Sequence, residues 1–203
     1  LALLEERGAD LVFLPEVREM YPRGDQSVTV DPGPMGSRLC GAYRPVHFRG
    51  VLTVMTKLLG LLEPEVVIVG RKDFQQLVLI ERMVGDLELK VEIVGAPIVR
   101  EQDGLAMSSR NAYLSAEERQ EAPALQRGLA AAVARYRTGE RGAEALLDAL
   151  RQELAGRPLL RLQYAEVVDG GSLDEVDPVP PGSVIALAAF CGSTRLIDNA
   201  TLE

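Results

Sequence analysis

Histidine and cysteine are scarce in this chain of 203 residues, which has one histidine, His47, and two cysteines, Cys40 and Cys191. Two distant cysteines are too few for a disulfide framework or a metal cluster. We therefore expect both to be small buried hydrophobic residues, which fits a reducing, cytoplasmic setting. A single histidine excludes a histidine-rich metal site, and we expect His47 to pack or cap at the start of a helix.

Positive net charge and long apolar runs are also absent. The chain has 22 Lys and Arg residues against 30 Asp and Glu residues, a net charge of −8. An acidic protein is a poor general partner for nucleic acid or for an anionic membrane, although a local basic pocket for a nucleotide stays possible. No apolar run approaches the roughly 20 residues that span a bilayer. The hydrophobic share of 47% is that of an ordinary globular protein.

Two common phosphate-binding fingerprints, Gly-x-Gly-x-x-Gly and Gly-x-x-x-x-Gly-Lys-Ser/Thr, are missing, which disfavours the dinucleotide and P-loop folds. The chain has instead an apolar β-branched run at residues 66–69, which predicts a strand buried on both faces of a parallel sheet. Gly70 then predicts a tight turn, and Asp73 a cap for the next helix. Lys72 between a strand and a helix N-terminus favours an anion site. An ordinary turn with a solvated lysine is the alternative.

Helical and strand patterns alternate through the first half of the chain. This alternation predicts an α/β domain with a parallel sheet over residues 1–98. The expected elements are the end of a helix up to residue 8, a strand at 10–14, a helical turn at 15–21, a strand at 27–30, helices at 47–62 and 74–84, and a strand at 89–94.

A different pattern begins at residue 99. Ser115 and Glu118 have the spacing of a capping box and predict the start of a helix. Helices followed by antiparallel strands predict a separate, smaller α+β domain over residues 99–203. Its expected elements are a strand and turn at 98–104, helices at 116–136 and 143–154, strands at 160–168 and 183–190, and a loop at 177–182.

Lys72 and Arg110 are the strongest candidates for binding an anion. A lysine ammonium is a movable point charge, whereas a guanidinium can bind two oxygens at once. Ser108 and Ser109 can add hydroxyl and N–H donors. Ligands of open α/β sheets bind beyond the carboxyl ends of the strands, where Gly70 is expected. The tetrapeptide Met-Ser-Ser-Arg is weak evidence alone, because a capped loop with a solvated arginine has the same sequence.

Four stretches together resemble the pantoate–β-alanine ligase (pantothenate synthetase) family. The resemblance covers nearly the whole chain in the right order, and its middle stretch is highly specific. The stretches are Arg-Pro-Val-His-Phe-Arg-Gly-Val at 44–51, Gly-Arg-Lys-Asp-Phe-Gln-Gln at 70–76, Val-Arg-Glu-Gln-Asp-Gly-Leu-Ala-Met-Ser-Ser-Arg-Asn at 99–111, and Gly-Ser-Thr-Arg-Leu-Ile-Asp-Asn at 192–199.

The resemblance implies an adenylate-forming ligase with a Rossmann-like nucleotidyltransferase sheet, incomplete at its N-terminus, followed by an α+β lid domain. Pantoate would attack the α-phosphorus of ATP, with Mg²⁺ expected, to give pantoyl adenylate and pyrophosphate. The amine of β-alanine would then attack the acyl carbon and release pantothenate and AMP. Preplaced cations would stabilise the charge that builds up on the pyrophosphate, and the lid would exclude water from the adenylate.

Roles follow from the resemblance position by position. Arg71, also assigned to the ATP site, stands where the family usually has glutamate and adds a positive charge there. The other implied roles are ribose contacts for Gly70 and Asp73, a phosphate contact for Lys72, a pantoate contact for Gln76, backbone contacts to adenine for Val99 and Met107, and a mobile phosphate-binding loop for Ser108, Ser109 and Arg110.

The chain also departs from the family. The family's His-x-Gly-His stretch, which supplies its catalytic histidine, does not occur in the sequence, and a glutamine that contacts pantoate and β-alanine is missing too. The chain begins without methionine inside a helix-to-strand unit, so we expect an upstream part to be missing and these residues alone to be poorly active.

Two further expectations concern association and function. The family suggests a homodimer, with the helix from His47 and residues 27–30 at its interface. The alternative function is a non-catalytic nucleotide-binding or dimerisation module. Other nucleotidyltransferases are disfavoured by the run at residues 103–111.

Overall fold

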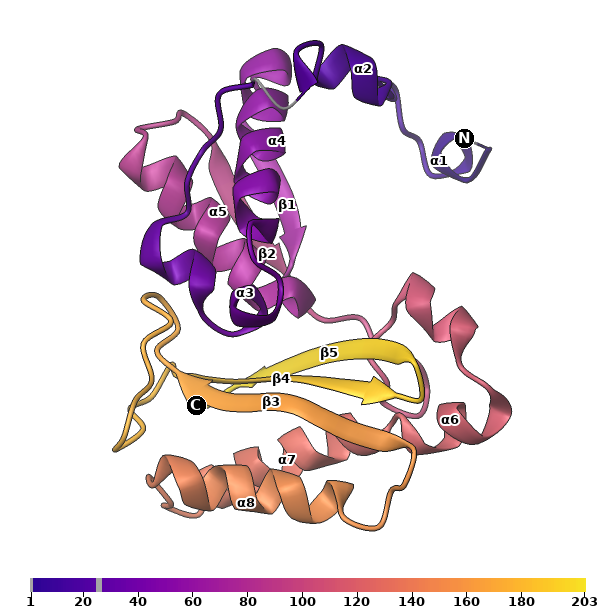
Figure 1. The fold of residues 1–203 in the computed structure, drawn as a ribbon, viewed down its shortest axis with the longest axis vertical. Coiled ribbons are helices and arrows are strands. Elements are labelled where there is room, and N and C mark those ends of the chain that lie inside the picture. The colour runs from indigo at the N-terminus through magenta and orange to yellow at the C-terminus, as the bar shows by residue number, and fades with distance from the viewer. Residues whose placement is uncertain (1, 25–26) are drawn as a thin grey trace.

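The computed structural model describes residues 2–24 and 27–203 and has the predicted α/β fold, in which a parallel sheet with helices is followed by a small antiparallel sheet (Figure 1). The parallel sheet pairs β1 (Val66–Gly70) with β2 (Glu92–Ala96), and the antiparallel sheet has the order β3-β4-β5. Among the described residues, no helix is long and apolar enough to cross a lipid bilayer. The other elements are α1 (Ala2–Glu6), α2 (Val17–Met20), η2 (Gly33–Ser37), α3 (Cys40–Tyr43), α4 (His47–Leu62), η3 (Arg71–Asp73), α5 (Phe74–Asp86), η4 (Ser109–Tyr113), α6 (Ala116–Glu121), α7 (Ala124–Arg137), α8 (Ala143–Leu154), β3 (Leu160–Val168), β4 (Val184–Cys191) and β5 (Thr194–Thr201).

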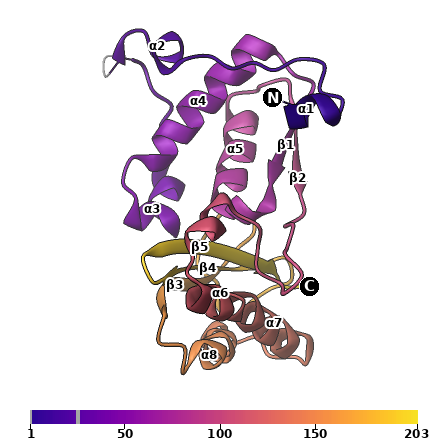
Figure 2. The ribbon, with the colours of Figure 1, turned by 90° about the vertical axis from the view of Figure 1, so that its right-hand side faces the viewer.

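Helices α4 and α5 cover one face of the parallel sheet (Figure 2). Val67 and Val69 point to this face and pack on a core that includes Phe48 and Ile80. Alternate residues point the other way, and Ile68 is 71% exposed. The prediction that this run is buried on both faces is therefore wrong, because helices pack on only one side of β1 in the described residues.

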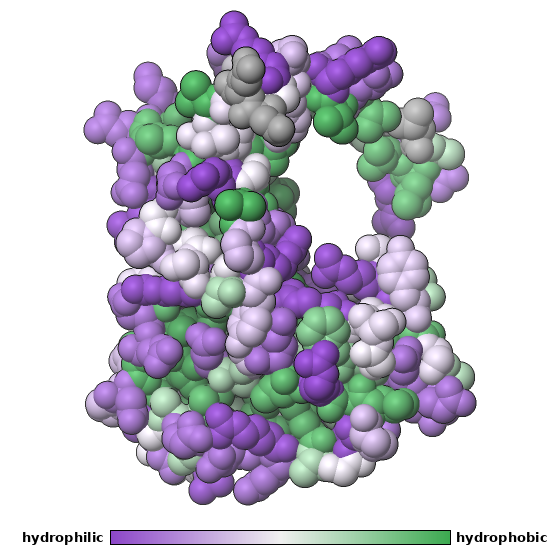
Figure 3. All heavy atoms as spheres, viewed as in Figure 1, coloured by the Kyte–Doolittle hydropathy of each residue, from purple (hydrophilic) through white to green (hydrophobic). Residues whose placement is uncertain are grey.

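Three predicted strands are absent. In place of the strand predicted within residues 98–104, the described chain has only an isolated bridge between Arg100 and Ala106. Residues 10–14 and 27–30 are all described, and neither segment pairs with another strand. Leu11 is 83% and Val28 is 93% exposed, and in Figure 3 apolar residues lie open on the N-terminal segment. The alternation of side chains was compatible with a strand, but a strand forms only where a partner satisfies its backbone. Leu1, part of the predicted first helix, lies outside the described residues.

The second half packs α7 and α8 against the antiparallel sheet. Leu129 of α7, Leu150 of α8 and Ile185 of β4 belong to one buried core. The helix predicted over 116–136 is two helices, because Pro123 removes a backbone donor between α6 and α7. The capping box is confirmed: Ser115 Oγ accepts from the Glu118 amide at 3.2 Å, and the Glu118 carboxylate accepts from the Ser115 amide at 2.8 Å.

The two halves meet beneath the parallel sheet. A third apolar cluster joins Leu39 and Val78 of the first half to Val168, Leu173 and Ala186 of the second. Arg38 adds a hydrogen bond to the Ser172 carbonyl and an ion pair with Asp174. The division into domains at residues 98 and 99 stays a prediction, since chain segments from both sides share this cluster.

Two helical glycines allow a matched test of helix packing. A Cβ on Gly60 in α4 would meet nothing within 4 Å, so Gly60→Ala is expected to raise the free energy of unfolding by about 0.5–1 kcal/mol. A Cβ on Gly128 in α7 would lie 3.1 Å from the Leu150 carbonyl oxygen, so Gly128→Ala is expected to lower it by about 1–3 kcal/mol. Urea unfolding followed by circular dichroism measures both, and equal effects would contradict the α7–α8 contact.

Candidate active site

The candidate site lies where β1 and β2 end. Gly70 pairs with Ala96 in the parallel register, so both strands deliver the chain to the same edge of the sheet. Strand β5 lies across this edge and contacts η3 and η4. The Lys72 turn, the loop after β2 and the antiparallel sheet therefore face one space, as the rule for open α/β sheets predicts.

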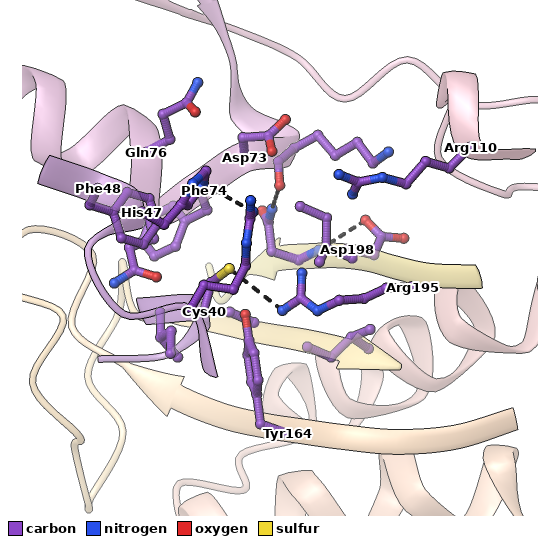
Figure 4. A pocket seen from close by; sticks show the side chains of 18 residues that line it. Cys40, His47, Phe48, Asp73, Phe74, Gln76, Arg110, Tyr164, Arg195 and Asp198 are labelled. Carbon is purple, nitrogen blue, oxygen red and sulfur yellow. Dashed lines mark hydrogen bonds between the residues drawn. The ribbon is translucent and has the colours of Figure 1, made fainter. Parts of the chain in front are cut away.

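Two adjoining hollows occupy this space, and Figure 4 shows the side chains that line the first. The first has a mixed lining, with apolar groups such as Phe74 and Tyr164 beside charged ones. The second is strongly polar. Its lining consists of Lys72, Asp73, Ser108, Ser109, Arg110, Arg195, Leu196 and Ile197, and five of these residues (Lys72, Asp73, Arg110, Arg195 and Ile197) line both hollows.

Three cations meet at the boundary between the hollows. Lys72 comes from η3, Arg110 from η4 and Arg195 from β5. Figure 4 shows Arg110 and Arg195 extending into the hollow from the same side. Ser108 and Ser109 add hydroxyl groups next to them. In a chain with a net charge of −8, this concentration of positive charge makes the polar hollow suited to a polyanion such as a chain of phosphates.

Lys72 is about half-buried, and its Nζ donates to the Met107 carbonyl at 3.1 Å. This bond links the turn after β1 to the loop after β2. Burial lowers the pKa of Lys72 below the usual value for lysine, and the nearby Arg110 charge lowers it further, whereas Asp73 and Asp198 oppose the shift. The ammonium is thus held in a place where its charge is poorly solvated, and an anion would compensate it.

The lowered pKa of Lys72 predicts a pH dependence of polyphosphate binding. The protonated ammonium binds phosphate, so affinity should fall as pH rises through this pKa, earlier than the ordinary lysine value of about 10.4 allows. Above the pKa, the dissociation constant should rise by up to about tenfold per pH unit. Lys72→Arg, whose guanidinium stays charged, should give a flat profile over the same range. Parallel profiles for the two proteins would contradict this assignment.

The loop that carries Ser108 to Arg110 is anchored at its base. Ser108 Oγ accepts from the Arg110 amide at 3.2 Å and shapes the start of η4. The side-chain Nδ2 of Asn111 donates to Glu101 Oε1 at 2.6 Å. Arg119 of α6 forms ion pairs with Glu101 and Asp103. The Asn111 hydrogen bond and then Arg119 lower the pKa of Glu101, and Arg119 lowers the pKa of Asp103. The base is therefore fixed while the Arg110 side chain stays exposed.

The structure brings together six of the residues predicted for the site. Lys72, Asp73, Gln76 and Arg110 line the mixed hollow, and Ser108 and Ser109 join Lys72, Asp73 and Arg110 around the polar one. Asp73 is the N-cap of α5 by position, but its side chain makes no capping hydrogen bond there, so the predicted cap is wrong.

Four predicted residues lie outside both linings in the described chain. Gly70 has an ordinary extended φ of −69°, so the predicted need for a glycine turn is wrong, although a Cβ there would project into open space. Arg71 turns away, and its Nε donates to the Gly95 carbonyl at 3.0 Å. The Met107 amide donates to the Val99 carbonyl at 2.9 Å, and the Met107 carbonyl already accepts from Lys72, so it could meet a base only after Lys72 moves.

His47 lies in the wall of the mixed hollow, where sequence reasoning placed only a structural role. Its Nε2 accepts from Arg44 at 3.0 Å and its ring contacts Phe48, with 5.0 Å between ring centroids. Partial burial, followed by the Arg44 and Arg195 charges, lowers the pKa of His47. A neutral imidazole is consistent with an Nε2 atom that accepts a hydrogen bond.

Sequence reasoning missed the residues that the antiparallel sheet contributes. Arg195 Nε donates to Gln163 Oε1 at 2.8 Å, and its Nη2 lies 3.5 Å from Cys40 Sγ. Tyr164 stacks on Tyr43, and burial raises its pKa. Arg195 belongs to one of the four stretches that carry the family resemblance, and this was the available signal. Cys40 was expected to be buried, but it lines the hollow and is only partly buried.

The described residues contain no cluster of three or more His, Cys, Asp or Glu side chains that could hold a metal ion. Asp73 is the carboxylate that the two hollows share. Magnesium often binds through one or two carboxylates together with substrate phosphates and water. This donor set therefore fits a magnesium ion that arrives with a nucleotide, and does not fit a cage made by protein alone.

Comparison with known proteins gives one consistent family. The family model described as pantoate-beta-alanine ligase matches residues 1–201. The pantothenate synthetase of Nocardioides sp. is 53% identical over 205 residues, which cover 100% of this chain and 60% of that protein. That of Syntrophus aciditrophicus is 49% identical, covering 97% of this chain and 68% of that protein. The chain thus spans about three fifths to two thirds of these relatives.

Solved structures of the same family share the fold. The pantothenate synthetase of Thermus thermophilus has a TM-score of 0.93 and 42% identity, covering 99% of this chain and 72% of that one. A pantoate-beta-alanine ligase from Francisella tularensis, complexed with beta-gamma ATP and beta-alanine, has a TM-score of 0.74 and 29% identity, covering 98% of this chain and 67% of that one.

Proposed function

The chain belongs to the pantoate–β-alanine ligase family, and from this premise we propose that it takes part in the ATP-dependent joining of pantoate and β-alanine to give pantothenate. The observation that carries the proposal is the meeting of Lys72, Ser108, Ser109 and Arg110, from two separate segments, around one polar hollow. The mixed hollow beside it, with Gln76 in its lining, provides room for a small hydroxy acid.

The proposed reaction has two steps. Oxygen of the pantoate carboxylate attacks the α-phosphorus of ATP, the bond to the β-phosphate oxygen breaks, and pyrophosphate leaves with its electron pair. The amine of β-alanine then attacks the acyl carbon of pantoyl adenylate, loses a proton, and AMP leaves. Lys72 and Arg110 would stabilise the charge on the departing pyrophosphate, since donors placed in advance act where charge develops. Magnesium, held by the phosphates and Asp73, would neutralise part of the same charge.

The remaining proposed contacts assign pantoate, ribose and adenine to particular residues. Gln76 would hydrogen-bond pantoate, and Gly70 and Asp73 would contact the ribose. Lys72 would leave the Met107 carbonyl to bind phosphate, and that carbonyl and the Val99 amide would then meet adenine. The second half of the chain would act as a lid over the adenylate, excluding water that would hydrolyse it.

Calorimetry distinguishes this function from the alternative, a non-catalytic nucleotide-binding or dimerisation module. ATP should bind to the chain, and pantoate should change the apparent affinity for ATP or the heat that ATP binding releases. A plain nucleotide module would bind ATP with the same heat and affinity whether pantoate is present or not. Because the sequence contains one histidine and no His-x-Gly-His stretch, we expect little AMP production from these residues alone. Rapid AMP production would contradict that expectation.

A homodimer is proposed as the assembly, with residues 27–30 and the start of α4 at its interface. Val28 is 93% and Val46 is 73% exposed, so both apolar side chains are available to a surface that another copy covers. Sedimentation velocity should show a dimer that Val28→Glu weakens. Leu61→Glu, at an exposed apolar position near the other end of α4, should leave the dimer intact. Identical behaviour of the two variants would argue against this interface.

A further inference from the structure

Two adjacent residues of β5 hold the two cationic segments of the site. Asn199 is buried, and its Nδ2 donates to the Arg71 carbonyl at 2.9 Å and to the Lys72 carbonyl at 3.0 Å. One amide group thus uses both of its N–H bonds on the turn that carries Lys72. Without it, two carbonyl oxygens of that turn would lose their partner from the antiparallel sheet.

Asp198 makes the corresponding contact to the other segment. Its carboxylate, 4% exposed as a residue, accepts two hydrogen bonds from Arg100, at 2.7 and 3.0 Å. Arg100 Nη1 also donates to the Gly104 carbonyl at 3.0 Å, and Arg100 pairs with Ala106 in a single β-bridge. The loop over residues 100–106 leads directly to Ser108 and Arg110, so Asp198 fixes the base from which these side chains extend.

We propose that Asp198 and Asn199 are positioning residues that set the separation of Lys72 from Arg110, and so determine how tightly the site binds a chain of phosphates. The inference rests on the proposed nucleotide function. Neither residue needs to touch the phosphates, because each acts through the segment it holds.

The sheet makes this pair a rigid support. Successive side chains of a strand point to opposite sides, so neighbours can reach two different segments. In β5, Asp198 pairs with Leu187 and Asn199 with Ala186 of β4, which fixes both positions. The hydrogen bond from Lys72 Nζ to the Met107 carbonyl joins the two segments directly. Each segment is therefore bonded both to β5 and to the other segment. When a binding site depends on a geometry held to a fraction of an ångström by such contacts, removing one contact lowers its affinity for the ligand.

Hydrogen exchange of the chain without ligand is the first test. Asn199→Ala should speed exchange in residues 71–76 by about tenfold or more and leave residues 99–110 unchanged. Asp198→Asn should do the reverse. Thr201→Ala, at an exposed position of the same strand, and Asp148→Asn, at an exposed ion pair on α8, should change neither segment. Equal effects of Asn199→Ala on both segments, or on neither, would overturn the proposed division of roles.

A double-mutant cycle on ATP affinity is the second test. Asn199→Ala should weaken ATP binding about tenfold in the wild-type background, and less than twofold once Lys72 is alanine, because contacting residues that act through one another are not additive. Asp198→Asn should show the same dependence on Arg110. Asn199→Ser, which keeps one hydroxyl donor, should recover part of the affinity. A general loss of stability would give equal losses in both backgrounds, and that result would overturn the inference.

The two tests distinguish failure of the positioning roles from failure of the proposed nucleotide function. If the wild-type chain binds ATP but the cycles are additive, the positioning roles are wrong and the proposed function stands. If the wild-type chain binds no ATP, the proposed function fails and the phosphate part of the inference fails with it. The exchange patterns then still decide whether Asp198 and Asn199 hold their segments.

Discussion

Replacing Lys72 with alanine is expected to weaken ATP binding by about ten- to a hundredfold. Lys72 is the half-buried cation of the site, and it faces the polar hollow together with Arg110 and Arg195. A hydrogen bond to a charged group is typically worth about 1.5–3 kcal/mol, which corresponds to this range of affinity. Isothermal titration calorimetry with ATP at pH 7 and moderate salt measures the change.

The chain supplies a matched control for this experiment. Lys90 is an exposed lysine just before β2, at the edge of the parallel sheet opposite the site. Lys90→Ala removes the same charge and should change ATP affinity by less than about twofold, because exposed charges at that distance are screened by salt. If Lys72→Ala binds ATP as Lys90→Ala does, Lys72 is not a phosphate-binding residue.

Leu150→Ala is expected to lower the free energy of unfolding by about 2–5 kcal/mol, the range for a fully buried leucine. Leu150 is fully buried in the core between α7, α8 and the antiparallel sheet. Gly128 lets α7 approach α8 at this point, and a Cβ built there would lie 3.2 Å from Leu150 Cγ. Two helices already in close contact cannot move together to fill the cavity. Urea unfolding followed by circular dichroism measures the loss.

Leu61→Ala makes the same chemical change on the surface of α4, where Leu61 is 61% exposed. It should alter the free energy of unfolding by no more than about 0.5 kcal/mol, as surface substitutions usually do. A loss for Leu150→Ala as small as that for Leu61→Ala would mean that the core between α7 and α8 is less tightly packed than the structure shows.

Local sequence patterns predicted many of the elements. The bounds of α4, α8 and β3 agree with the predicted ranges 47–62, 143–154 and 160–168. Long amphipathic helices and a long strand of alternating apolar and polar residues are set mainly by their own periodicity. Strand β5 was missed as a strand, because Arg195, Asp198 and Asn199 interrupt its apolar residues and its pairing with β4 decides its conformation.

Some residues of the candidate site were likewise predicted from sequence, and others were not. Lys72, Ser108, Ser109 and Arg110 were recognisable because they follow predicted elements and match a specific family stretch. Arg195, Asp198 and Asn199 also lie in a family stretch, but they were not assigned to the site, since nothing in local periodicity says which strand will cross the end of the parallel sheet. Arg71 shows the opposite error: its place beside Lys72 suggested the ATP site, whereas its side chain bonds the Gly95 carbonyl.

The sequence by itself determined the family, the main helices and the two cationic segments, because these depend on residue type and on spacing within a few turns of chain. Only the tertiary structure decided that β5 lies between those segments and holds each of them through Asp198 and Asn199. The docking of β5 joins residues that are 98 and 128 positions apart in sequence. Contacts of that kind follow from how whole elements pack, and no local pattern encodes them.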